Sequence, residues 1–140
     1  MRRCRGFSLL ELLITLGIVA ILLTVALPAY QSSVIKSRRS DAMAALVEVA
    51  GRQEQWRFAA GRYTDDLLEL GYAEDPMTSD EGHYRIAADT CGDDSLASCF
   101  LLTATPGSGS PQSNDRRCAT LTLDARGGRG ATGTDPAGCW

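Results

Sequence analysis

The stretch GFSLLELLITLGIVAILLTVALPAY, from Gly6 to Tyr30, decides the fold of this 140-residue chain. No charged side chain occurs in the 24 residues from Leu12 to Ile35, a length that spans the hydrocarbon core of a bilayer. The preceding residues carry Arg2, Arg3 and Arg5, which favour a cytoplasmic location for that end. We therefore expect one membrane-spanning helix, with its N-terminus in the cytoplasm and the rest of the chain outside.

The apolar run does not fit a cleavable secretory signal. Such signals have an apolar region of about 7 to 15 residues that ends in a small-x-small cleavage site. Here the run is longer, and Leu27-Pro28-Ala29-Tyr30-Gln31 follows it. An ordinary single-span anchor stays open as an alternative.

Glu11 argues against the ordinary anchor, because its carboxylate lies within the apolar run. An ionised side chain costs about 2.5–3.5 kcal/mol near the centre of a membrane helix and less near its end. If the chain is cut between Gly6 and Phe7, the new α-amine lies one helical turn before Glu11. That amine can then meet the glutamate of an adjacent copy.

A short basic leader ending in Gly6, then Phe7, Glu11 and an apolar helix interrupted by Pro28, resembles the class III signal of type IV prepilins and pseudopilins. The resemblance implies that prepilin peptidase cuts after Gly6 and methylates Phe7, and that Glu11 pairs with a neighbouring Phe7 during assembly. It implies a leader at 1–6, a membrane and filament-core helix at 7–30, and a periplasmic or extracellular head at 31–140. Cleavage leaves eleven basic and seventeen acidic side chains, a balance of −6.

Pro28 is expected to kink the helix, which then continues to about residue 60. An apolar stripe at steps of three and four residues supports this continuation, and Gly61 is a natural C-cap. The stripe consists of Ala42, Leu46, Val49, Gln53, Trp56 and Ala60. A short helix capped by Thr64 is predicted to run through Leu70.

Three strands are predicted, at His83–Ala88, Cys99–Thr105 and Cys118–Leu123, which places a sheet at about 83–124. Residues Gly107–Asn114 are predicted to form a flexible surface loop, and the segment after Leu123 shows no periodicity. The fold class is therefore α+β. The type IV pilin resemblance adds the arrangement, a long N-terminal helix packed on a small antiparallel sheet of three to four strands.

Loss of the leader removes Cys4 and leaves four cysteines in a part of the chain that lies outside the cytoplasm, where disulfides form. Three connectivities are open. We expect Cys118–Cys139, which would tie down the tail and contribute about 3 kcal/mol, together with Cys91–Cys99. Zinc is disfavoured because the spacings lack a closely spaced cysteine pair, so no metal site is expected.

The second half of the chain is similar to PilE-type minor pilins, in Gln53–Trp56, Gly61–Tyr63, Leu70-Gly71 and the segment from Cys118 to Trp140. The similarity implies a disulfide-bounded region at 118–139 on the outer face of the head. Two features depart from the pattern. Ala20 stands where major pilins usually have glycine, so melting of the helix between Gly17 and Pro28 is less assured, and the Cys91–Cys99 pair is not general in the subfamily.

No enzyme and no cofactor are expected. The chain has a single histidine, His83, and lacks a nucleophile elbow, a phosphate-binding loop and a Cys-His pair. The acidic stretch from Asp65 to Asp94 does not match a calcium loop and is expected to be a solvated face.

Two groups of basic residues suggest binding partners. A small patch for DNA or a protein partner is formed by Arg116, Arg117, Arg126 and Arg129, although a structural role is favoured. Lys36, Arg38 and Arg39 follow the apolar segment, where an anionic lipid surface is the simplest partner.

The resemblance predicts a minor pilin that is held in the bacterial inner membrane and then incorporated into a type IV pilus at the cell surface. Its implied partners are prepilin peptidase, the major pilin, other minor pilins, the inner-membrane assembly platform and the membrane itself. Two alternatives remain open. One is a type II secretion pseudopilin, whose heads more often close with calcium, and the other is a DNA-binding competence pilin.

Overall fold

The computed structural model describes residues 7–140, which fall into two compact units divided between Val34 and Ile35. Helix α1, Leu9–Ala60, contributes residues to both units. In the unit before Ile35 the described residues belong to the helix except Phe7 and Ser8, whereas the unit from Ile35 to Trp140 contains the whole sheet and is called the head below.

In the N-terminal unit, every described residue from 7 to 33 is exposed, and most of these side chains are apolar. The hydroxyl groups of Thr15, Thr24, Ser32 and Ser33 donate to carbonyl oxygens of the helix backbone three or four residues earlier. Pro28 lies inside α1 without ending it. By length and composition this helix is able to cross a membrane.

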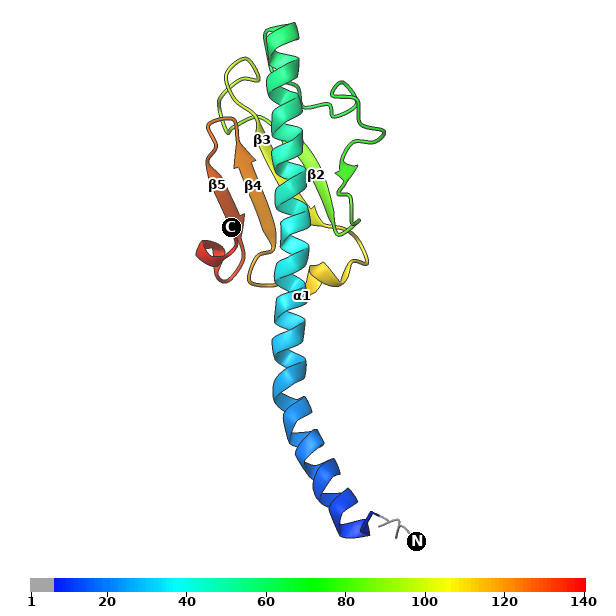
Figure 1. The fold of residues 1–140 in the computed structure, drawn as a ribbon. Helices are drawn as coiled ribbons and strands as arrows, with labels where there is room; N and C mark the ends of the chain where they lie inside the picture. Colours follow the sequence, from blue (N-terminus) through cyan, green and yellow to red (C-terminus); the bar gives the residue numbers. More distant parts are fainter. Residues whose placement is uncertain (1–6) are drawn as a thin grey trace. The chain divides into compact units, whose positions relative to one another are not determined.

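The head contains one five-stranded antiparallel sheet in the order β1-β2-β3-β4-β5 (Figure 1). Its strands are β1 (Met77–Thr78), β2 (Tyr84–Asp89), β3 (Leu101–Pro106), β4 (Thr120–Asp124) and β5 (Arg129–Thr132). Two 3-10 turns, η1 (Pro111–Asn114) and η2 (Pro136–Gly138), complete the described elements. The three central strands correspond to the three predicted ones, each shifted by one to two residues toward the C-terminus.

The sheet is wider than expected because it has a strand at each edge that the sequence did not reveal. At one edge, two-residue β1 pairs Met77 with Ile86 of β2. At the other, β5 pairs Ala131 with Leu121 of β4. The predicted fold class is confirmed, with five strands in place of three to four.

The core of the head lies between α1 and the sheet. From α1, Ala42, Leu46 and Val49 are completely buried, and they join a cluster with side chains of β2, β3 and β4. Besides Leu46, the largest fully buried side chains of that cluster are Tyr63, Tyr84, Phe100, Leu67, Ile86, Leu102 and Leu121. Burial of this apolar surface is the main stabilising contribution to the head.

The predicted helical stripe is buried at its first four positions, but Trp56 is only half-buried and Ala60 is exposed. As predicted, the helix ends at Ala60, and Gly61 follows with a left-handed φ of +76° while its N–H donates to the Arg57 carbonyl.

Two local predictions are wrong. Residues 64–71 form successive turns in place of a helix, because Thr64 Oγ1 accepts from Asp66 N and Asp66 Oδ1 accepts from Leu68 N. The segment Gly107–Asn114 is not simply a flexible surface loop, since it contains η1 and buries Gln112 completely.

Candidate functional site

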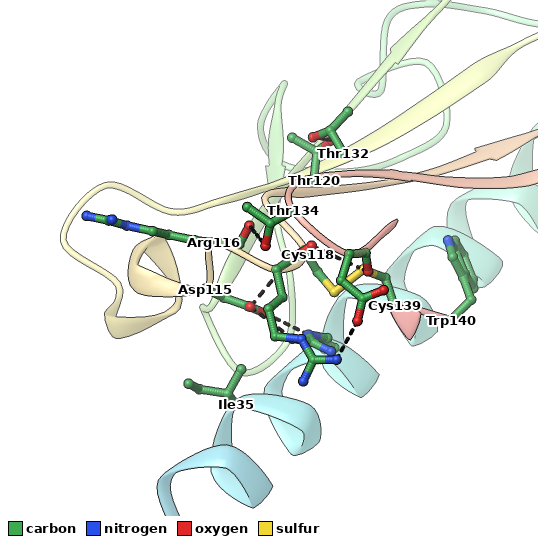
Figure 2. The surroundings of a disulfide bond; sticks show 12 residues. Ile35, Asp115, Arg116, Cys118, Thr120, Thr132, Thr134, Cys139 and Trp140 are labelled. Atoms are coloured by element: carbon green, nitrogen blue, oxygen red, sulfur yellow. Dashed lines mark hydrogen bonds and ion pairs between the residues drawn. A yellow bond between two sulfur atoms is a disulfide. The ribbon is translucent and has the colours of Figure 1, made fainter. Parts of the chain in front are cut away.

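The C-terminal region of the head is closed by a disulfide between Cys118 and Cys139, with a Cα–Cα distance of 5.7 Å (Figure 2). A second disulfide joins Cys91 to Cys99, also with 5.7 Å between Cα atoms. The structure thus contains the two pairs expected from the sequence. The first holds η2 against the segment before β4, and the second closes a loop between β2 and β3.

Backbone hydrogen bonds join the last part of the chain to the segment around Cys118. The N–H groups of Thr134 and Asp135 donate to the carbonyl oxygens of Arg116 and Arg117, at 3.0 and 3.2 Å. Beside them, the hydroxyl oxygens of Thr120 and Thr132 lie 2.7 Å apart (Figure 2). The C-terminal region is therefore held in place by the disulfide together with these backbone and side-chain hydrogen bonds.

Gly133 permits this close approach of two backbones. Its φ of +133° lies in the region that favours glycine, and a Cβ added there would overlap the carbonyl oxygen of Arg117. No other residue type fits this position without moving one of the two segments.

Beneath the region, a buried ion pair connects α1 to the residue that follows η1. Arg39 Nε and Nη2 donate to the two carboxylate oxygens of Asp115, at 2.6 and 2.9 Å. Gln112 Nε2 donates to the same carboxylate at 3.0 Å. Arg39, grouped above with Lys36 and Arg38 as a residue for an anionic lipid surface, thus has two of its three guanidinium nitrogens committed to Asp115.

The four arginines proposed as a patch do not form one cluster. Arg116 and Arg117 precede β4, whereas Arg126 and Arg129 follow it in the turn to β5 and at the start of β5. Arg117 pairs with Asp135 at 2.5 Å. In the turn, Arg126 pairs with Asp94 at 3.0 Å, so both guanidinium charges are partly neutralised by neighbouring carboxylates.

Arg116 differs from its neighbours because its exposed side chain has no ion pair or hydrogen bond with any other residue that the structure describes. Figure 2 shows it extending away from the Cys118–Cys139 bond. Arg129 lies over the ring of Trp140, with 5.1 Å from Cζ to the centroid, and the indole Nε1 donates to the Gly130 carbonyl at 2.7 Å. An exposed cation and an arginine-capped indole are thus both presented near the disulfide.

Across residues 7–140, no group of three or more His, Cys, Asp or Glu side chains is arranged to hold a metal ion. The acidic residues instead make local contacts, as where Asp124 Oδ1 accepts from the N–H groups of Arg126 and Gly128 in the β4–β5 turn.

At the other end of the chain, Phe7 and Glu11 are both exposed, and Glu11 lies in the first turn of α1. Among the residues that the structure describes, Glu11 has no ion-pair partner. The proposed cleavage residue Gly6 lies outside the described residues.

Two solved structures with the same architecture show which class of fold this is. A type IV pilin from Shewanella oneidensis is 27% identical, covers 76% of this chain and 97% of its own, and superposes with a TM-score of 0.50. The non-core minor pilin PilV of Neisseria meningitidis, at 21% identity, covers 73% and 90% of the two chains with a TM-score of 0.52, and so matches in fold. The head on its long helix is a type IV pilin fold.

The chain belongs to the family described as "Type IV minor pilin ComP, DNA uptake sequence receptor", whose model matches residues 28–122. Residues 1–27 match the family described as "Prokaryotic N-terminal methylation motif". The resemblance to type IV pilins is thereby confirmed from both ends of the molecule.

Two curated relatives are similar over part of their length. The type IV major pilin protein PilA of Myxococcus xanthus is 33% identical over 86 residues, which is 61% of this chain and 38% of PilA. A type IV major pilin protein PilE1 of Neisseria gonorrhoeae is 32% identical over 72 residues, or 51% and 44% of the two chains. The matched segments therefore span less than half of either relative.

Proposed function

We propose that the chain is a minor type IV pilin: a structural subunit, with no catalytic role, that is cut after Gly6, methylated at Phe7 and assembled into a pilus. The observation that supports this proposal is the N-terminal methylation motif at residues 1–27, joined to a pilin head. In this proposal residues 1–6 are the leader, 7–30 form the membrane and filament-core helix, and 31–140 form the head. Before assembly the chain is a single-pass protein of the inner membrane.

Glu11 and Phe7 set the register of the assembled subunit in this proposal. The carboxylate lies on an exposed apolar helix, where an opposite charge lowers the cost of burying it between subunits. The methylated amine of a neighbouring Phe7 is the proposed partner, while Pro28 adjusts the path of the helix. The major pilin, other minor pilins and the assembly platform are the proposed protein partners, and motility and adhesion the proposed processes.

Intact mass and N-terminal sequencing of sheared surface filaments, beside inner-membrane protein, test the proposal. A chain that starts at N-methylated Phe7 and is far less abundant than the major pilin supports a minor subunit. A chain that keeps Met1–Gly6 and stays in the membrane, in cells with an active peptidase, contradicts it. A mature chain found only with the type II secretion machinery would establish the pseudopilin alternative.

The second candidate function is DNA capture by the head, which the description of the matching family favours. Exposed Arg116 and partly exposed Trp140 offer a cation for phosphate and an aromatic face, although Trp140 is already covered by Arg129. Binding of a labelled duplex by the full-length chain in detergent tests it. Arg116→Ala is expected to weaken binding and to lower the slope of log K against log salt by about 0.9, the contribution of one phosphate contact.

Arg126→Ala is the matched control for that experiment, because Arg126 is also exposed but is paired with Asp94 at the far end of β4. Binding that is insensitive to salt, or equally reduced by both substitutions, argues against a DNA site at Arg116.

A further inference from the structure

A cleft of about 240 Å³ lies in the head between α1 and the segment that carries η2. It is lined by Lys36, Arg39, Met43, Gly138, Cys139 and Trp140. No aspartate or glutamate side chain is among the residues that line this cleft, although the mature chain carries more acidic than basic side chains. Two cationic side chains therefore face a space with apolar walls.

Arg39 is held in place before any ligand arrives. Its side chain is 5% exposed, and the carboxylate of Asp115 fixes Nε and Nη2 from behind. Within the described part of the chain the remaining nitrogen, Nη1, has no hydrogen-bond partner, and it is not among the atoms sealed from solvent. A guanidinium fixed in this way offers a donor at little cost in conformational entropy.

Lys36 supplies the second charge. It is exposed and, within residues 7–140, forms no ion pair. Among the side chains, the charge of Arg39 is balanced by Asp115, so Lys36 carries the unbalanced side-chain charge of the cleft. That charge matches one phosphodiester anion.

We propose that this cleft binds the phosphate of an anionic phospholipid headgroup while the chain is held in the membrane. The proposal rests on the proposed function, since it requires the membrane-anchored stage. Its ligand follows from the sequence: Lys36 is the first charged residue after the 24-residue uncharged run, within one helical turn of the end of that run. While the uncharged run spans the membrane, Lys36 lies at the level of the phospholipid headgroups, and these carry the phosphate groups found there.

The apolar walls fit the same ligand. Tryptophan is favoured at membrane interfaces, where its ring lies among the headgroups, and Trp140 and Met43 offer an indole and a thioether to the glycerol and first methylene groups. The lipid would thus contact both α1 and η2. Release of the lipid is then a required step when the subunit leaves the membrane for the filament.

Lipid titration of the full-length chain tests the proposal. The chain, in nonionic detergent, is titrated with phosphatidylglycerol or phosphatidylcholine, and bound lipids are counted by native mass spectrometry. We expect one phosphatidylglycerol per chain, in preference to phosphatidylcholine. Lys36→Gln should weaken this binding about fivefold, which corresponds to one surface charge.

Arg38→Gln is the matched control. It also removes one positive charge, but Arg38 lies two positions after Lys36 and does not line the cleft. It should change the affinity less than about twofold. In a Trp56→Phe background only Trp140 emits, and its emission should shift with phosphatidylglycerol in the Arg38→Gln chain but not in the Lys36→Gln chain.

Equal effects of the two substitutions, equal binding of the two lipids, or displacement of the lipid by inorganic phosphate or a short DNA duplex would overturn the proposal. Fractionation of cells distinguishes failure of the lipid proposal from failure of the proposed function. A chain that stays in the membrane and is processed but binds no lipid contradicts the cleft alone. A chain that never enters the membrane contradicts the proposed function.

Discussion

Arg39 and Asp115 are 76 positions apart in the chain and form a two-point ion pair whose side chains are 5% and 3% exposed. The pair links α1 to the loop between η1 and β4, and it lies under the terminal disulfide region. Because both charges are removed from water, each depends on the other for compensation.

Asp115→Ala is expected to lower the free energy of unfolding of the head by about 3–5 kcal/mol, because it leaves the Arg39 guanidinium buried without a counter-charge. Denaturant unfolding of the full-length chain, followed by tryptophan fluorescence, measures the change. Arg126→Ala, which removes an exposed ion pair, should cost no more than about 1 kcal/mol. Similar losses of unfolding free energy in the two variants would show that burial does not make the Arg39–Asp115 pair more important for stability than an exposed pair.

Gly133→Ala should destabilise the head by at least about 2 kcal/mol, since the new Cβ strains the backbone and meets the Arg117 carbonyl. Gly51→Ala is the opposite case. Gly51 is exposed inside α1 with open space at the Cβ position, so alanine should stabilise the helix by about 0.5–1 kcal/mol. Melting temperatures that move in the same direction would refute this reading of Gly133.

The double substitution Cys118→Ser with Cys139→Ser is expected to cost about 3 kcal/mol, because it opens a loop closed over 21 positions. Loss of Cys91–Cys99, which closes only 8 positions, should cost slightly less, about 2.5 kcal/mol. Amide hydrogen exchange distinguishes the two further. Faster exchange at Thr134 and Asp135 should follow loss of the first disulfide and not of the second.

Alkaline pH is expected to destabilise the head. Burial raises the pKa of Tyr84 to about 12, and burial, helped by Glu48, raises the pKa of Tyr72 to about 12 as well. The folded chain therefore keeps these protons when the unfolded chain has lost them, and the free energy of unfolding falls as pH rises from about 10 toward 12.

Tyr84→Phe should flatten that decline while changing stability little at neutral pH, because the hydroxyl is sealed from solvent and its contact with the Gln112 side chain, which lowers the pKa, lacks the geometry of a hydrogen bond. Denaturant midpoints at a series of pH values measure both effects. An unchanged pH slope in the variant would show that Tyr84 does not titrate with unfolding.

Most of the architecture could be predicted because its signals are local. The uncharged run and the stripe from Ala42 to Gln53 indicate α1, and the alternation around Leu121 and Leu123 indicates β4. Strand β5 gave no such signal, since Gly130 and Ala131 provide no apolar alternation. It forms because the β4–β5 turn, stabilised by Asp124, brings residues 129–132 into register with β4.

The site could be predicted only in part. The two disulfides match the expected pairs, although the four cysteines after residue 6 left three connectivities open, whereas Asp115 gave no signal among the polar residues before β4. Its importance depends on contact with Arg39, a pairing across most of the head that no local pattern encodes. The four arginines were grouped by closeness in sequence, whereas β4 places them at its two ends.

The strand order of the sheet follows the order of the chain, so no connection crosses another. The β4–β5 turn has only exposed residues at Arg126–Gly128, whereas the β3–β4 connection commits Gln112 and Asp115 to the interior. Sequence changes among descendants of this pilin should therefore accumulate in the β4–β5 turn. In the β3–β4 connection such variation is restricted at Gln112 and Asp115, because a change at either position would disturb the interior.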